Sequence, residues 1–97
     1  MKDKTEILHL LAIYKLTAER KYGIDRIGVF GSVARDEQTE FSDVDICYEG
    51  KAPSVLTLDI IQTELEQLLG CRVDLVRVRE NMNSLLKRRI QQEALYV

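Results

Sequence analysis

Apolar residues recur at helical spacing in three long stretches of this chain, at residues 4–22, 54–69 and 83–95. In each stretch they return every three or four positions with charged residues between them, which predicts amphipathic helices that bury one face. Gly23 and Gly70 follow the first two stretches and are typical helix ends.

Shorter runs of apolar and β-branched residues predict three strands, at residues 26–30, 42–48 and 72–76. A short helical segment is expected at residues 33–36, after the first strand. The predicted order is helix, strand, short helix, strand, helix, strand, helix. We therefore expect an α/β (α+β) fold in which a small mixed β-sheet has helices packed on one face and a partly open face opposite.

Length and composition indicate one small domain over residues 1–97. The chain is 45% hydrophobic, which is enough for one modest core. A net charge of −2 and six aromatic residues, four Tyr and two Phe, provide no basic surface for general nucleic-acid binding. No apolar run approaches the roughly 20 residues that span a bilayer, and the N-terminus lacks the apolar core of a secretion signal. We expect a cytoplasmic protein.

Gly31 and Ser32 stand where the first predicted strand ends. Glycine permits a tight reversal and lets backbone N–H groups approach an anion closely. The Ser32 hydroxyl and the first N–H groups of the short helical segment would face the space beyond the strand end, and phosphate oxygens suit that place. Arg35, three residues after Ser32, is a further candidate for a phosphate or acceptor contact.

Two aspartates, Asp43 and Asp45, follow Ser32 after ten intervening residues. Alternate residues of a strand share a face, so both carboxylates would point one way while Val44 and Ile46 point to the core. Neighbouring carboxylates resist joint ionisation unless a cation lies between them. Mg²⁺ is the natural candidate, because it takes one or two protein carboxylates together with substrate phosphates.

Asp74 offers a third carboxylate. It alternates with Val73 and Leu75 in the third predicted strand, and it joins the same open face if that strand pairs beside the strand of Asp45. Three acids around one or two Mg²⁺ ions would orient a hydroxyl for in-line attack on phosphorus and neutralise charge on a departing pyrophosphate. Together these features indicate nucleotidyl transfer.

Taken singly, each feature also has an ordinary explanation. Gly31 and Ser32 could form a simple turn, and the aspartates could be solvated strand residues. Their joint occurrence at fixed spacing is uncommon by chance and favours a site. The basic run at residues 87–89 is interpreted as a solvated helix face, and a phosphate or partner contact is the less favoured alternative.

The Gly31–Ser32 pair, the ten-residue gap, the aspartates Asp43 and Asp45 and the later Asp74 resemble the DNA polymerase β-like nucleotidyltransferase superfamily. The form GSVAR…SDVDI resembles its minimal nucleotidyltransferase (MNT) branch, over nearly the whole chain. The resemblance implies the polymerase β-like nucleotidyltransferase fold. It implies that Gly31 and Ser32 bind the triphosphate of ATP, that Asp43 and Asp45 hold two Mg²⁺ ions, and that Asp74 completes the metal site and helps to activate the acceptor hydroxyl.

The resemblance also implies a partner. Members of the MNT branch are commonly encoded beside a small helical HEPN protein, and some act as the antitoxin of a HEPN/MNT toxin–antitoxin pair by transferring AMP from ATP to the toxin. We therefore expect a HEPN-like toxin as partner, while the acceptor group, the nucleotide preference and the oligomeric state stay open. Many relatives have Gly after the Ala-Arg pair, where this chain has Asp36; an acid there would oppose phosphate binding if it faced the corner.

Two other functions stay open. A binding module of the same fold could neutralise or scaffold a HEPN-like partner without chemistry, leaving the aspartates as remnants. Transfer to a small molecule such as an aminoglycoside is less favoured, because it usually calls for an extra domain that closes the acceptor site. Substitution of Asp43 and Asp45 separates catalysis from simple binding.

Overall fold

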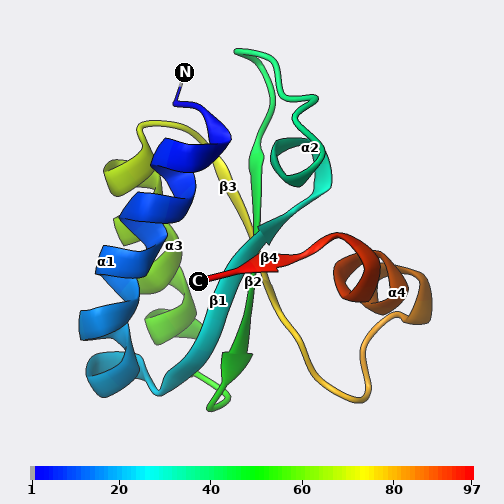
Figure 1. Cartoon of the computed structure of the whole chain (residues 1–97). Coiled ribbons are helices and arrows are strands. Elements are labelled where there is room, and N and C mark those ends of the chain that lie inside the picture. The colour runs from blue at the N-terminus through cyan, green and yellow to red at the C-terminus, as the bar shows by residue number, and fades with distance from the viewer. Residues whose placement is uncertain (1) are drawn as a thin grey trace.

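A computed structural model describes residues 2–97, in which helices and strands alternate along the chain (Figure 1). The elements in chain order are α1 (Lys4–Tyr22), β1 (Ile24–Phe30), α2 (Gly31–Ala34), β2 (Val44–Gly50), α3 (Val55–Leu69), β3 (Val73–Arg77), α4 (Ser84–Glu93) and β4 (Leu95–Tyr96). The order is the predicted one with the addition of β4. None of the helices between residues 2 and 97 has the length and apolar character that a membrane crossing requires.

The strands form one mixed sheet in the order β3-β2-β1-β4. β1 runs antiparallel to both β2 and β4, whereas β2 and β3 are parallel. A parallel pair needs a crossover connection, and α3 supplies it between β2 and β3. The predicted small mixed sheet is therefore confirmed.

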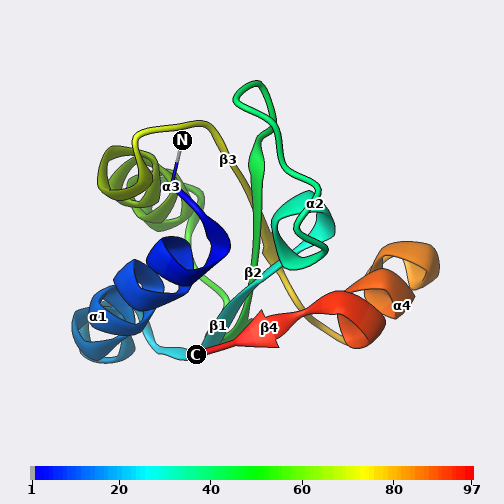
Figure 2. The same cartoon turned by 45° about the horizontal axis from the view of Figure 1, so that its top comes forward.

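The main core lies between the sheet and the helices α1 and α3, which both cover one face (Figures 1 and 2). Three alternate residues of β2, Val44, Ile46 and Tyr48, belong to this core and are at most 1% exposed. Ile61 and Leu65 of α3 pack in the same cluster and are fully buried. The helical spacing in the sequence correctly predicted this face of α3.

The opposite face of the sheet is partly covered by α4 (Figure 2). Ile90 of α4 forms a second, smaller buried cluster with Phe30 and Cys47. The expectation that all helices pack on one face is therefore wrong for α4, in which Leu85 is 71% exposed. The physical reason is that Phe30 and Cys47 make part of this face apolar, and α4 removes that part from water.

The strand β4 was not predicted, because the last helix was expected to reach Leu95 but ends at Glu93. Leu95 and Tyr96 pair with Val29 and Gly28 of β1. The two backbones approach so closely that a Cβ on Gly28 would overlap the Leu95 carbonyl oxygen, so glycine is required there. Two residues are too few to show a strand period in the sequence.

Candidate active site

The corner between β1 and α2 is built around Gly31. This residue has a φ of 70°, in the left-handed region that favours glycine. A Cβ at this position would overlap Oδ2 of Asp45 and lie 3.1 Å from its Cγ. The Gly31 backbone therefore lies directly against the Asp45 carboxylate, and any side chain at residue 31 would displace it.

Asp45 and Asp74 are direct partners in the parallel pairing of β2 with β3. In-register residues of adjacent strands point to the same face, and the strands lie about 4.8 Å apart. Asp45 also pairs with Phe30, the last residue of β1 before the Gly31 corner. The structure thus brings Gly31, Asp45 and Asp74 together on the face opposite the main core, and Asp74 does not turn to the far side of the sheet.

Asp43 occupies a different position from the one expected. β2 begins at Val44, so Asp43 precedes the strand rather than belonging to it. Its side chain is 51% exposed, and Oδ1 lies 4.0 Å from Nε of the exposed Arg72. Asp43 is close enough to Asp45 to act on its ionisation but is the least constrained of the three acids.

Burial raises the pKa of Asp45, and the negative charge of Asp74 raises it further. The positive charge of Arg89 lowers this pKa, the charge of Asp43 raises it, and that of Arg35 lowers it. The net direction is upward, so the Asp45 carboxylate is held in a place that disfavours its charge. A cation beside it would reverse that effect.

The oxygen donors of this face match the preference of Mg²⁺ for carboxylate ligands. Among residues 2–97, however, no three or more His, Cys, Asp or Glu side chains are grouped so that they alone could hold a metal ion. The expected group of three metal-binding acids is therefore not preformed. Within it, the pair of Asp45 and Asp74 is the part whose position is fixed by strand pairing. Mg²⁺ commonly binds through one or two carboxylates and completes its shell with water and substrate phosphates.

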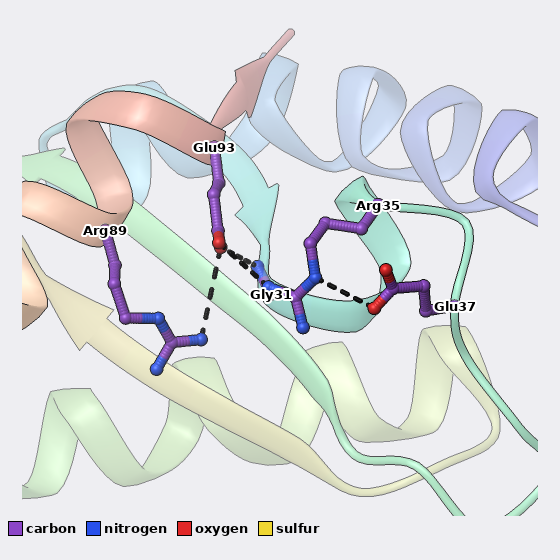
Figure 3. Close-up of polar contacts among 5 residues, drawn as sticks. All are labelled: Gly31, Arg35, Glu37, Arg89 and Glu93. Carbon is purple, nitrogen blue, oxygen red and sulfur yellow. Dashed lines mark hydrogen bonds and ion pairs between the residues drawn. The ribbon is translucent and has the colours of Figure 1, made fainter.

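Glu93, the last residue of α4, reaches the Gly31 corner (Figure 3). The Gly31 N–H donates to Glu93 Oε2 at 3.1 Å, and Nη1 of Arg35 donates to Glu93 Oε1 at 2.8 Å. Nη2 of Arg89 lies 4.0 Å from Oε2. Sequence reasoning missed Glu93, because its only local signal is helical spacing from Arg89, which is common on solvated helix faces.

Arg35 lies beside the corner, as the sequence suggested, but its guanidinium is already engaged. Besides Glu93 it contacts Glu37, with 3.1 Å between Nε and Oε2. Hydrogen bonds to Glu37 and Glu93 raise the pKa of Arg35. Ser32 is the second residue of α2 and is partly exposed, and its backbone carbonyl accepts the Glu37 N–H at 2.8 Å.

Asp36 does not face the corner. Its carboxylate accepts a hydrogen bond from the Lys4 ammonium at 2.7 Å, and its side chain is 65% exposed. Asp36 is also the only non-glycine residue between residues 2 and 97 with a positive φ, at 59°. Glycine adopts that conformation without strain, which gives a physical reason for the Gly that many MNT proteins carry here.

Comparisons with known proteins identify the family of the chain. Residues 12–97 match the family described as Nucleotidyltransferase domain. Protein adenylyltransferase MntA of Thermococcus cleftensis is 39% identical over 93 residues, which cover 95% of this chain and 93% of the relative.

Solved structures share the fold. One that is provisionally named a minimal nucleotidyltransferase has a TM-score of 0.77 at 34% identity, covering 97% of this chain and 95% of its own. A chain in the complex of tri-AMPylated Shewanella oneidensis HEPN toxin with MNT antitoxin has a TM-score of 0.64 at 21% identity, covering 92% of this chain and 68% of its own. The second likeness is one of fold alone.

Proposed function

Because the chain belongs to the nucleotidyltransferase domain family and is a nucleotidyltransferase, we propose that it transfers AMP from ATP to a hydroxyl of a partner protein, with Mg²⁺ as cofactor. The observation that carries this proposal is the contact of Gly31 with Asp45, beside which Asp74 lies in register. A place for a phosphate tail and a place for a cation thus adjoin each other. Neither an isolated turn nor a solvated strand face requires that juxtaposition.

The proposed reaction is an in-line displacement at the α-phosphorus of ATP. The acceptor oxygen forms a bond to that phosphorus, the bond to the bridging oxygen of the β-phosphate breaks, and pyrophosphate leaves with the electron pair. Asp74, the exposed member of the Asp45–Asp74 pair, takes the hydroxyl proton. Gly31 shapes the corner in which Ser32 and the neighbouring backbone hold the triphosphate tail, and Arg35 lies beside that corner.

We assign the metal ligands to Asp45 and Asp74, with Asp43 as a further ligand that comes from the loop. Mg²⁺ bound there would neutralise negative charge on the phosphates as the bond to pyrophosphate breaks. The raised pKa of Asp45 supports this assignment, because a bound cation would favour the charged carboxylate that burial and Asp74 now disfavour. The assignment needs only the two ordered acids and the substrate phosphates.

For the acceptor we propose a helical HEPN-like toxin. Two observations support it: a 39% identical relative is named protein adenylyltransferase MntA, and a neighbour of the same fold is an MNT antitoxin in complex with an AMPylated HEPN toxin. The aspartates lie on an exposed part of the sheet rather than deep in the core, so a hydroxyl presented by a folded partner can reach them. The protein would then act as an antitoxin through covalent modification.

The test is transfer of AMP in a purified system. The protein, MgCl₂ and ATP labelled at the α-phosphate are incubated with a candidate HEPN-like partner, and the partner is analysed by intact mass. With wild type we expect a mass gain of one or more AMP groups. Asp45→Asn lacks a metal ligand, so its transfer should be slower by about a thousandfold, roughly 4 kcal/mol of transition-state stabilisation, and we expect no mass gain. Asp59→Asn, an exposed acid of α3, is the matched control and should behave as wild type.

Three results would contradict the proposal. Equal transfer by wild type and Asp45→Asn would remove Asp45 from the chemistry. Neutralisation of the partner's toxicity by Asp45→Asn without any mass gain would instead support the binding-module interpretation. Turnover of a small hydroxyl compound, with none of the protein partner, would assign the acceptor to a different class.

A further inference from the structure

The corner at Gly31 is fastened by a residue far away in the chain. Glu93 follows Gly31 by 62 positions, yet its carboxylate accepts the Gly31 N–H at 3.1 Å. The side chain of Glu93 is 22% exposed, so this contact is shielded more than an ordinary surface pair. Figure 3 shows the carboxylate with Arg89 on one side and with Gly31 and Arg35 on the other.

Both ends of this contact are held by the sheet. Gly31 directly follows β1, and Glu93 comes two residues before Leu95, the first residue of β4. β1 and β4 pair through Val29 with Leu95, and the Ala94 N–H donates to the Ile90 carbonyl at 2.9 Å. The backbone around Glu93 is therefore fixed, and the carboxylate is presented to Gly31 by paired strands rather than by a free helix end.

The same carboxylate forms ion pairs with two arginines, Arg35 and Arg89. Arg35 is the C-cap residue of α2, and Arg89 lies one turn before Glu93 in α4. A carboxylate that accepts from a guanidinium and a backbone N–H makes charge-assisted hydrogen bonds, which are stronger than neutral ones. Glu93 thus keeps both cations next to Asp45, where a triphosphate would bring further negative charge.

We propose that Glu93 is a positioning residue of the active site, which holds the Gly31 turn and orients Arg35 and Arg89 beside Asp45 for binding of the ATP phosphates. This role rests on the proposed function. Glu93 can act in this way without touching the nucleotide. Gly31 lies against Asp45, so a change in the Gly31 backbone also releases the Asp45 carboxylate. Preorganisation of this kind stabilises the bound phosphates by avoiding the cost of ordering the corner when they arrive.

The opposite role is a carboxylate that occupies the phosphate place and must leave before ATP binds. The two roles predict opposite changes in ATP affinity when Glu93 is substituted. Removal of a positioning residue weakens ATP binding, whereas removal of a competitor strengthens it. The two hydrogen bonds that the Glu93 carboxylate accepts, from the Gly31 N–H and from Arg35, favour the positioning role, because a departing carboxylate would break both.

The experiment compares Glu93→Gln and Glu93→Ala with wild type, and uses Glu19→Gln as the matched control. Glu19 belongs to an i,i+4 pair with Lys15 on α1, at 3.7 Å, so it tests the loss of one helical glutamate charge away from the site. Glu93→Gln keeps an acceptor oxygen and the side-chain size, which keeps the test valid if Glu93→Ala fails to fold. Urea unfolding establishes that each variant is folded.

The first readout is hydrogen exchange of the Gly31 amide, followed by NMR without nucleotide. We expect exchange about tenfold faster or more in Glu93→Ala, an intermediate rate in Glu93→Gln and no change in Glu19→Gln. An unchanged rate in the folded Glu93 variants overturns the inference. This readout does not depend on the proposed function.

The second readout is the Kd of Mg-ATP by calorimetry. We expect an increase of about tenfold for Glu93→Ala and a smaller increase for Glu93→Gln, with the wild-type value for Glu19→Gln. Tighter binding by either Glu93 variant, or unchanged binding by both, overturns the positioning role. If wild type itself binds no Mg-ATP, the proposed function fails, and the exchange rates still decide whether Glu93 holds the corner.

Discussion

The two faces of the sheet are built on different principles. The face covered by α1 and α3 is closed by aliphatic side chains such as Ile46, Ile61 and Leu65, each fully buried. The face beneath α4 has only a three-residue buried cluster around Ile90, and beside it lie Asp45, Asp74 and the carboxylate of Glu93. The first face provides stability, and the second places charged groups that water and ligands can reach.

The difference has an electrostatic cause. Apolar side chains stabilise the fold wherever they are buried, and the buried residues of the described chain include no charged side chain. Carboxylates beside one another need water, arginines or a cation, so the face that carries them has to stay partly uncovered. α4 satisfies both demands, because Ile90 faces the cluster while Arg89 and Glu93 face the acids.

Leu65→Ala should produce the largest loss of stability. Leu65 is fully buried in the main core, and deletion of such a side chain lowers the free energy of unfolding by about 2–5 kcal/mol, through lost burial and a residual cavity. Urea unfolding followed by circular dichroism measures the change. Leu16→Ala, on the exposed side of α1 at 68% exposure, should change it by less than about 0.5 kcal/mol. Equal losses for the two variants would contradict the assignment of the core.

Ile90→Ala should separate stability from chemistry. The residue is 2% exposed but packs in the smaller cluster, so we expect a loss near the lower end for buried Ile, about 2 kcal/mol. At a temperature where Ile90→Ala and Leu65→Ala are both folded, AMP transfer should fall only in Ile90→Ala, because α4 carries Glu93. Transfer rates measured alongside unfolding test this, and a parallel fall in both variants would show that the faces are not independent.

Asp45→Asn should remove a pH dependence of stability. Burial and Asp74 raise the pKa of Asp45, so the folded state binds this proton more tightly than the unfolded chain. The residue therefore contributes stability below its ordinary pKa of about 3.9 and loses that contribution as pH rises through the raised folded value. The stability of Asp45→Asn relative to wild type should grow over this range, by less than about 1 kcal/mol because water screens a partly exposed carboxylate.

Urea unfolding at a series of pH values from about 3.5 to 7 measures that difference. Asp59→Asn is the control, and its difference from wild type should stay level. A difference for Asp45→Asn that shrinks as pH rises would mean that favourable partners, rather than burial and Asp74, dominate the ionisation of Asp45.

Asp36→Gly should have the smallest effect. Glycine relieves the positive φ of 59°, but the unfolded chain gains entropy and the exposed pair with Lys4 is lost. These contributions oppose one another, and we expect the free energy of unfolding to change by about 0.5 kcal/mol or less. Binding of Mg-ATP should stay at the wild-type value; a severalfold gain in affinity would show that the Asp36 charge reaches the phosphates.

Most of the main core could be predicted from the sequence, because its information is local. The helical spacing of Ile61 and Leu65 and the alternation of Val44 and Ile46 each depend on a few neighbouring residues. The sequence placed Asp45 and Asp74 on one face only on the condition that their strands pair, and the structure supplies that pairing.

The other face depends on contacts that no local pattern encodes. The single fully buried position of α4, Ile90, does not tell which face of the sheet it covers. β4 has two residues, and Glu93 acquires its role only when paired strands carry it to Gly31. Asp43 was wrongly placed inside the strand because β2 begins at Val44, two residues later than predicted, and such boundaries depend on hydrogen bonds rather than on side-chain type.

The pairing of β4 with β1 also determines when the corner can form during folding. Local helices and the β1–β2 hairpin join nearby segments, whereas the Gly31–Glu93 contact closes a separation of 62 residues. Contacts of such long range form late, because chain entropy is lost before they contribute. On mild denaturation, the ability to bind nucleotide should therefore disappear before the helical signal, and a folding chain should acquire it last.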